Sequence, residues 1–420
     1  MRLAYWLNDK LPFYYGWVVA AASGTAVFAR MAPAITTLTV FIYPMSQELG
    51  WSRTMISGSV SAGALAALAV SPMIGWAIDR FGARPVLVIS IMVLGVSISS
   101  LAWATVPLTF YLAYGAARIV FHTSAPIGAT TVVSQWFIKK RGRAIGIVFV
   151  GGAIGGLVFT MASALLIDHY GLKVAWISLG AIVLAVSLAP TLFLIVERPE
   201  DMGLSPDNEP RDRPSPVLAG IARPEDHSWT LKAAMGTVPF WILFVMGFAV
   251  FFVGSGVNVH IGAYYRDQGL SVSMAATAIS VSWIAAAAGS VGWGWVLEKV
   301  EARFAYSAIM LIQSAGNIYL MSVSSNGEAL VASVLIGLVT GGSNVIPSFM
   351  YAHFFGRTQL GRIRGVGEIG VLLGQSTGPL LAGIVFDFRE SYSLIFIAFS
   401  AVSLACSVLV LGARQRGSPE

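Results

Sequence analysis

The chain has few charged residues. Only 11% of its 420 residues are Asp, Glu, Lys or Arg, and 56% are hydrophobic, whereas soluble domains carry about 25% charged residues. A soluble fold has too little interior for this much apolar surface, so we expect a lipid bilayer to surround most of the chain. The apolar runs are about 20 residues long, which favours membrane-spanning helices over the short alternating strands of a β-barrel.

Cysteine is scarce as well. Cys406 is the single cysteine, which excludes an intrachain disulfide and a cysteine-based metal site. The sequence also has no phosphate-binding G-x-x-x-x-G-K loop, no zinc-binding H-E-x-x-H pattern and no convincing nucleophile elbow. We therefore expect no enzyme activity and no cofactor or metal, and transport would draw its energy from gradients or exchange rather than from ATP.

The apolar runs predict an all-α integral membrane protein with 12 transmembrane helices in two six-helix bundles. The expected spans are residues 15–41, 55–77, 85–106, 109–136, 144–167, 174–196, 239–264, 272–297, 304–324, 328–355, 363–386 and 391–412. One long polar stretch, rich in Pro and charge, follows the sixth span and reads as a linker. The expected domains are therefore a first bundle (1–196), a linker (197–236) and a second bundle (237–420).

Lys and Arg residues fall mainly on one side of this arrangement. With the amino terminus inside, twenty lie in the inner loops, linker and termini, four lie in the outer loops, and Arg30 and Arg118 lie within spans. This asymmetry predicts that both termini are cytoplasmic. The net charge of +6 thus reflects topology and predicts no nucleic-acid partner. We expect a multi-pass protein of the cell membrane, of the bacterial inner-membrane type, that functions as a monomer.

A charged island at residues 75–84 returns at residues 294–303. Its acid, the base that follows and a later arginine recur exactly 219 positions on, and so do three residues at the start of the fifth span. The matched pairs are Asp79/Glu298, Arg80/Lys299, Arg84/Arg303, Gly142/Gly361, Arg143/Arg362 and Gly146/Gly365. Each repeat has six spans, so the two halves enter the membrane in the same direction and should be related by an axis along the membrane normal.

Twelve spans, a linker after the sixth and the pattern G-x-x-x-D-R-x-G-x-R at 75–84 resemble the major facilitator superfamily. The resemblance implies that the islands latch the two halves together on the cytoplasmic side, through Asp79, Arg80, Arg84, Glu298, Lys299 and Arg303. Physically, an acid near the amino terminus of a helix in the other half is favoured by the helix dipole. The alternative is that the cations only mark the inner side. The second island departs from the pattern, with Glu301 in place of Gly82.

Three further motifs resemble the monocarboxylate porters and the oxalate:formate antiporter-like group. They are Tyr15-Gly16-Trp17, Leu49-Gly50-Trp51-Ser52 and the run from Trp136 to Gly146 that leads into a glycine-rich span. Animal members of that group carry a lysine in span one and an Asp-Arg pair in span eight. Both are missing here, so the resemblance does not supply a proton-and-lactate mechanism.

Two arginines are expected near the membrane midplane. Arg30 lies in the middle of span one, and Arg118 lies about nine residues into span four. An arginine at this depth costs roughly 2.5–3.5 kcal/mol, so it must face protein or water. No acid shares their depth, which favours an anionic substrate as the missing partner. The alternative is that each arginine bonds backbone carbonyls and holds helices together.

Other polar residues within spans are weaker candidates. His122 shares a helix face with Arg118 and could bind substrate or relay a proton, or simply pack. Glu368 is the one carboxylate clearly inside a span, so it is a candidate for proton coupling, although an ion pair with Arg364 is the stronger interpretation. Asn258, His260 and Tyr264, in the outer part of span seven, could contact substrate or close the outer mouth. Asn344 and Gln375 are uncharged substrate-binding candidates, for which helix–helix hydrogen bonding is the alternative.

We therefore expect a secondary active transporter of a small organic anion, a monocarboxylate or small dicarboxylate, that works by alternating access. Proton symport and anion exchange both remain open, so protons are a candidate second partner. The first alternative is an efflux transporter for drugs or other small solutes, which would tolerate loss of Arg30. The second is a membrane sensor, which would bind its ligand without moving it.

Overall fold

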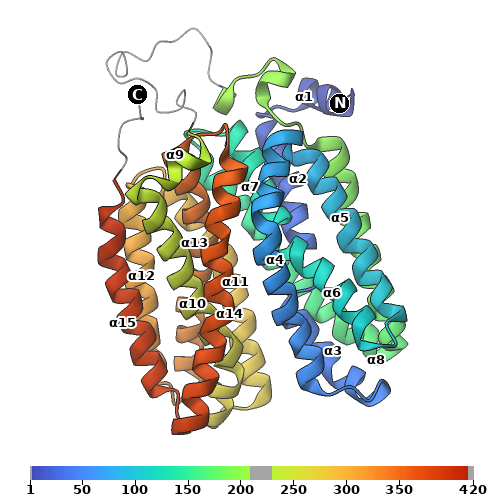
Figure 1. Cartoon of the computed structure of the whole chain (residues 1–420), viewed down its shortest axis with the longest axis vertical. Helices are drawn as coiled ribbons and strands as arrows, with labels where there is room; N and C mark the ends of the chain where they lie inside the picture. Colours follow the sequence, from blue (N-terminus) through green and yellow to red (C-terminus); the bar gives the residue numbers. More distant parts are fainter. Residues whose placement is uncertain (1, 209–228, 415–420) are drawn as a thin grey trace.

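The computed structural model describes residues 2–208 and 229–414, and these residues contain helices and no β-strand. Figure 1 shows two groups of long helices side by side, with the short helices α1 and α9 at one end, here called the linker face. The helices are α1 (Arg2–Lys10), α2 (Gly16–Ala29), α3 (Ile35–Glu48), α4 (Arg53–Phe81), α5 (Ala83–Ser100), α6 (Pro107–His122), α7 (Ser124–Trp136), α8 (Arg141–Leu194), α9 (Leu231–Met235), α10 (Val238–Asp267), α11 (Val272–Val296), α12 (Ala302–Leu320), α13 (Asn326–Phe355), α14 (Leu360–Arg389) and α15 (Ser393–Leu409).

The predicted 12 spans in two six-helix bundles are confirmed, but four of them do not form one separate, continuous helix each. Span one is divided into α2 and α3, and span four into α6 and α7. Spans five and six form α8, which turns back at Gly171, where φ is 80°. Eight segments are long and apolar enough to cross a membrane by themselves. Counting α8 as two spans gives nine, and joining the parts of spans one and four adds two more. The twelfth is α12, which carries the polar residues Gln313 and Asn317.

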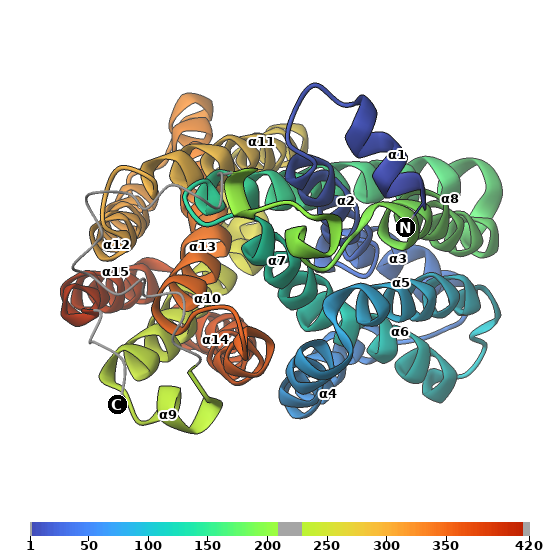
Figure 2. The same ribbon diagram turned by 90° about the horizontal axis from the view of Figure 1, so that it is seen from above.

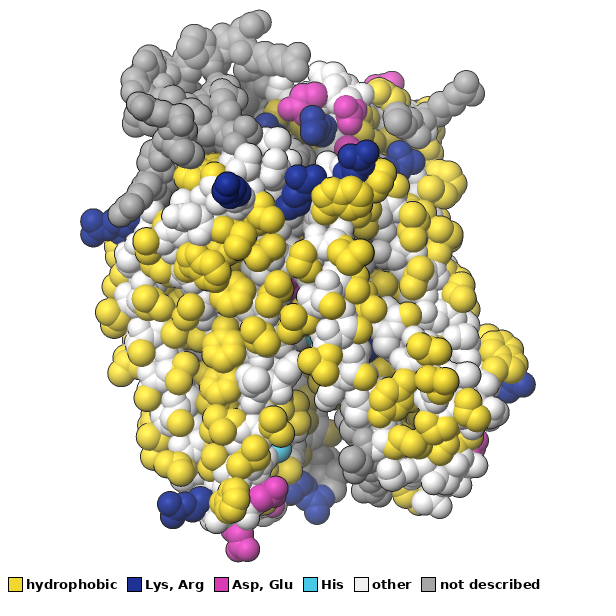
Figure 3. All heavy atoms as spheres, in the orientation of Figure 1, with side chains coloured by type: hydrophobic (Ala, Val, Ile, Leu, Met, Phe, Trp, Pro, Cys, Tyr) yellow, Lys and Arg dark blue, Asp and Glu magenta, His cyan; other side chains and the backbone are white. Residues whose placement is uncertain are grey.

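Charged and apolar side chains are separated along the long axis. Figure 3 shows apolar atoms over the middle of the molecule and Lys, Arg, Asp and Glu mainly at its two ends. Large apolar side chains such as Leu65, Val96 and Val408 are more than 60% exposed. A belt of exposed apolar surface between charged ends is what a hydrocarbon layer requires of a helical membrane protein.

The two bundles meet through two equivalent helix pairs. The helix α4 of the first bundle packs against α14 of the second, and α8 packs against α11. Viewed from the linker face, α7, α13 and α14 lie near the centre and α12 and α15 at one edge (Figure 2). These pairs correspond to spans two and eleven, and to spans five and eight. The packing therefore follows the internal repeat.

The structure describes only part of the linker. Residues 209–228 lie outside the described residues, so the boundaries 1–196, 197–236 and 237–420 stay a prediction. On its first-bundle side, Tyr5 and Tyr14 donate hydrogen bonds to the carbonyls of Asp201 and Ser205, at 2.6 and 3.0 Å. On its second-bundle side, the amide of Leu231 donates to Gln359 at 3.1 Å. Both ends of the linker are thus held against their own bundle.

Candidate functional site

Arg30 and Arg118 lie where spans one and four are broken. The helix α2 ends at Ala29, and Arg30 is its capping residue before the non-helical stretch 31–34. The helix α6 ends at His122, one residue before the break at Thr123, and Arg118 lies one turn earlier. The last carbonyl groups of a helix have no partner within it. Each break therefore exposes acceptors at membrane depth, where water is scarce.

Each arginine donates to a carbonyl at the other break. Arg30 Nη1 lies 3.3 Å from the carbonyl oxygen of Phe121, and Arg118 Nη1 lies 3.3 Å from that of Pro33. The Tyr114 hydroxyl also donates to Pro33, at 2.9 Å. One nitrogen of each arginine thus bonds a backbone carbonyl and holds two helices together. This is the alternative role that the sequence analysis gave for both residues.

Three further nitrogen atoms of these side chains and of His122 have no hydrogen-bond partner among the described residues. They are the Nε atoms of Arg30 and Arg118 and the Nε2 atom of His122, and all three are buried. The guanidinium carbons lie 5.0 and 4.6 Å from the centre of the same Phe121 ring, and the His122 ring packs edge-on against it at 4.8 Å. Arg118 and His122 are each 3% exposed. The result is a compact group of partly unused nitrogen atoms around one aromatic ring, here called the arginine cluster.

Glu368 approaches the arginine cluster from the second bundle. Its charge interacts with those of Arg30 and Arg364, so Arg30 does have an acidic neighbour that its predicted depth had not suggested. The predicted ion pair with Arg364 is not formed, because none of the pairs within 4.0 Å among the described residues includes Glu368. Arg364 instead donates to the Ser348 hydroxyl at 3.1 Å. Glu368 thus faces two cations without being tied to either.

Several second-bundle candidates make hydrogen bonds that favour a packing role. His260 lies 3.2 Å from the Tyr392 hydroxyl and 3.1 Å from the carbonyl of Pro379. Tyr264 is buried and donates to the carbonyl of Leu320. Asn344 donates to Thr340 in its own helix at 2.9 Å. The bonds of His260 and Tyr264 thus reach other helices, whereas the bond of Asn344 stays within α13.

Asn258 and Gln375 lie elsewhere. Asn258 is exposed on α10 and lines a small cavity within the second bundle, away from the arginine cluster of the first. Gln375 is half-buried in α14, and its backbone carbonyl accepts a hydrogen bond from Ser255 at 3.3 Å. Among the described residues, no hydrogen bond or ion pair joins either of them to Arg30 or Arg118.

The acid of the first charged island reaches across to the second bundle. The two carboxylate oxygens of Asp79 accept hydrogen bonds from the backbone amides of Gly361 and Arg362, both at 2.8 Å. These amides open α14, so the carboxylate lies at the positive end of a helix dipole, as the sequence argument required. The Asp79 side chain is only 7% exposed. The contact is therefore well shielded from solvent.

The acid of the second island makes the equivalent crossing with different chemistry. Glu298 forms a bidentate pair with Arg143 at the start of α8, at 2.7 and 2.6 Å. The repeat thus places an acid of each half against the first turn of the fifth span of the other half. The change from Gly82 to Glu301 alters the turn but not this crossing: Gly82 has a φ of 91°, whereas Glu301 has a φ of −55° and needs no glycine.

The contacts that the structure gives for the island cations lie within their own halves. Two of them lie over nearby rings, Arg80 over Trp76 at 5.7 Å and Lys299 over Trp295 at 3.7 Å. Arg84 donates to the carbonyl of Leu192 at 2.5 Å. Arg303 pairs with Glu301 at 2.7 Å. An exposed cation gains more from a neighbouring ring or carbonyl than from a distant acid.

Two sets of contacts at the linker face were not predicted from the sequence. Gln135 and Arg357 exchange hydrogen bonds between the bundles, each side chain donating to the other's backbone carbonyl at 3.1 and 2.9 Å. Glu197 accepts from the amides of Ala83 and Arg84 at 3.2 and 2.6 Å. Burial raises the pKa of the Glu197 carboxyl, although these two bonds act in the opposite direction. Neither pair is related by the repeat, so no sequence pattern marked them.

Comparisons with known proteins fit this arrangement. The sequence model of the Major Facilitator Superfamily matches residues 19–315 and 263–420. A gallate transporter of Pseudomonas putida is 25% identical over 99% of this chain and 96% of its own length, and human monocarboxylate transporter 11 is 25% identical over 95% and 83%. The crystal structure of the human organic anion transporter MFSD10 shares the fold, with a TM-score of 0.69 at 14% identity over 94% of this chain and 98% of that one. The family and these relatives are membrane transporters, not enzymes. The chain therefore belongs to the Major Facilitator Superfamily.

Proposed function

We propose that this protein is a secondary active transporter of small organic anions, and that the arginine cluster binds their carboxylate group. The observation that carries the proposal is the set of unused, buried donor atoms on Arg30, Arg118 and His122. Buried donors without partners are costly, and a carboxylate would satisfy two of them with charge-assisted hydrogen bonds. The relatives named for gallate and for monocarboxylates support an anionic substrate.

Alternating access would use the contacts at the linker face, which we place in the cytoplasm because Lys and Arg concentrate there. The bonds of Asp79 to the start of α14 and of Glu298 to Arg143 hold that face closed. They would break when the bundles rock and the opposite face closes. Glu368 remains the candidate for proton coupling. When an anion binds Arg30, the Glu368 carboxylate would lose the positive charge that stabilises it and could take up a proton.

The first test measures the binding of small carboxylates to the purified protein. Binding is detected as a rise in the temperature of thermal unfolding. A ligand at 100 times its dissociation constant adds about 2.7 kcal/mol to native stability. We expect one class of acid to raise the unfolding temperature of the wild type, and to do so much less for Arg30→Gln and Arg118→Gln. Each shift is measured against the same variant without ligand, which removes the effect of the lost carbonyl contacts.

Arg389→Gln is the matched control, because Arg389 is exposed at the opposite end of the molecule and its loss changes the net charge equally. The control should respond to the acid as the wild type does. If the two cluster variants also respond as the wild type does, the carboxylate site is wrong. If no acid has an effect while neutral or cationic compounds do, the efflux alternative replaces the proposal.

A further inference from the structure

A large aromatic side chain of the second bundle touches the first bundle within the membrane-spanning part of the molecule. It is Trp283, which lies on α11 and is half-buried. A Cβ atom at Gly156 in α8 would lie 3.4 Å from its Cε2 atom, so the indole ring covers this glycine. Nearer the linker face, Gly142 and Gly146 of α8 meet backbone atoms of α11 instead. The contact between the two helices thus changes from backbone to ring as it leaves the linker face.

The Trp283 ring lies close to the residues that surround Arg30. The same Cβ position at Gly156 is 3.4 Å from the Cε atom of Met31, the residue that follows Arg30. The Arg30 guanidinium itself lies 5.8 Å from the centre of the Phe149 ring. Phe149 precedes Gly156 by two helical turns, so both residues share one face of α8 and lie about 10 Å apart along it. The guanidinium and the indole ring are thus placed along one helix face at about this separation.

The internal repeat shows that packing between the bundles does not by itself require a tryptophan here. The matched pair Gly75 and Gly294 keeps α4 of the first half in register with α11 of the second. At the position equivalent to Trp283, α4 has Ala64, which is 6% exposed. The corresponding helix of the first half therefore carries no ring at this depth. A ring that the fold does not demand, half-buried near a substrate-binding candidate, favours a role in binding.

The separation of the two groups sets the size of a molecule that could touch both. A charge-assisted hydrogen bond to Arg30 takes up about 2.8 Å, and the centre of a ring stacked on Trp283 lies about 4.5 Å or more from the indole. Of the separation of about 10 Å, about 3 Å then remains between the carboxylate and the ring centre. This length suits a single aromatic ring that carries its carboxylate directly.

We propose that Trp283 is a specificity-determining residue, which stacks on the ring of an aromatic carboxylic acid while Arg30 holds the carboxylate. The inference rests on the proposed function and narrows its substrate class to acids with one aromatic ring. Because Arg30 belongs to the first bundle and Trp283 to the second, such an acid contacts both bundles at once. Its binding therefore responds to the relative position of the bundles, as alternating access requires.

The test compares benzoate with propionate, which has a carboxylate but no ring. Equilibrium binding is measured on the purified full chain, for the wild type, Trp283→Leu and Trp283→Phe. We expect Trp283→Leu to bind benzoate about tenfold more weakly than the wild type, because it loses a ring pair and part of the buried area. It should bind propionate within about twofold of the wild type. Trp283→Phe keeps a ring and should retain most of the affinity for benzoate.

A second measurement does not require Trp283→Leu to fold. The protein is labelled with 5-fluorotryptophan, and the ¹⁹F NMR resonance of Trp283, one of 12 tryptophans, is identified as the one that Trp283→Phe lacks. Benzoate should shift this resonance in the wild type, because its ring would lie against the indole. Propionate should shift it much less.

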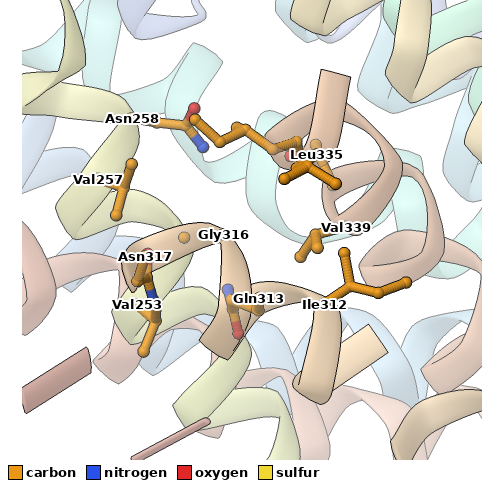
Figure 4. Close-up of a pocket in the computed structure, with 12 residues that line it drawn as sticks. Val253, Val257, Asn258, Ile312, Gln313, Gly316, Asn317, Leu335 and Val339 are labelled. Atoms are coloured by element: carbon orange, nitrogen blue, oxygen red, sulfur yellow. Dashed lines mark hydrogen bonds between the residues drawn. The ribbon is translucent and has the colours of Figure 1, made fainter. Parts of the chain in front are cut away.

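Two control variants replace apolar side chains elsewhere. Trp103→Leu removes a ring that is 60% exposed in the first bundle. Leu335→Ala changes the wall of the small cavity between α10, α12 and α13 shown in Figure 4, which Trp283 does not line. Both variants should bind benzoate as the wild type does. A loss of benzoate binding in Leu335→Ala but not in Trp283→Leu would place the ring in that cavity and overturn the inference.

The remaining outcomes separate this inference from the proposed function. If benzoate fails to bind while another carboxylate binds, or if Trp283→Leu binds benzoate as tightly as the wild type, the role of Trp283 is wrong and the proposed function stands. An unmoved Trp283 resonance in the presence of saturating benzoate leads to the same conclusion. If no carboxylate binds at all, both are wrong.

Discussion

At the residue scale, Arg30 and Arg118 meet one of the two roles that the sequence allowed, the bond to a backbone carbonyl, and keep a nitrogen atom available for the other. One nitrogen of each is bonded to a backbone carbonyl, and another is left without a partner. The sequence could place both residues at membrane depth, because charges within apolar runs are conspicuous. It could not supply their partners, which are the carbonyls of Pro33 and Phe121. Backbone acceptors become available only where a helix ends, and carry no side-chain signal.

Asp79 gives a prediction for the closed linker face. Replacing Asp79 by Asn removes the charge that faces two amides at the start of α14, and leaves one amide oxygen to accept. This should cost the closed state about 1–3 kcal/mol and shift the population toward opening at the linker face. The measurement is the distance between spin labels at Phe81 and Thr358, both exposed, in a Cys406→Ser background.

Glu301→Gln is the control for that distance, since Glu301 is exposed and pairs within its own half. The control should keep the distance distribution of the starting protein. An unchanged distribution in Asp79→Asn would show that this carboxylate does not hold the bundles together.

At the element scale, helices from opposite bundles touch through glycine. A Cβ atom at Gly294 in α11 would collide with the carbonyl of Gly142 in α8, and one at Gly75 in α4 with the carbonyl of Gly361 in α14. These four glycines are two pairs of the internal repeat. Small residues of this kind permit close approach of membrane helices. Because the obstacle is backbone rather than a flexible side chain, only movement of a whole helix can relieve it.

Gly294→Ala should therefore separate α11 from α8 at the linker face. We expect a loss of thermal stability in the closed state of about 1–3 kcal/mol, the usual cost of overpacking. Gly292→Ala, in the same helix, has nothing within 4 Å of the new atom and gains the same helix propensity, so it should be neutral or slightly stabilising. Equal unfolding temperatures for the two variants would contradict this account of the interface.

Helix number was predictable from the sequence, but helix continuity was not. Apolar run length gave every span, since a bilayer imposes about 20 residues on each crossing. Pro33 and Pro126 lie close to the breaks in spans one and four. Pro347 and Pro379, however, lie inside the continuous helices α13 and α14. Proline alone therefore could not distinguish a bend from a break, because neighbouring helices can satisfy the freed carbonyls.

At the scale of the whole molecule, the repeat governs the linker face but not the membrane interior. Both halves send an acid to the first turn of the other half's fifth span, and this contact could be foreseen from the matched islands. Within the spans the two halves differ. The repeat matches Arg118 and His122 of the first half to Gly337 and Gly341 of the second. The contacts that join the bundles at the linker face thus follow the repeat, whereas the arginine cluster belongs to the first half alone.

The most direct measurement is uptake into proteoliposomes of the acid that stabilises the purified protein, compared for wild type, Arg30→Gln, Arg118→Gln and Arg389→Gln. We predict saturable uptake by the wild type and by Arg389→Gln, and at least a tenfold loss in both cluster variants, since each removes a charge-assisted contact worth about 1.5–3 kcal/mol. Undiminished uptake by Arg30→Gln and Arg118→Gln would contradict the claim that this protein carries an anion on its two buried arginines.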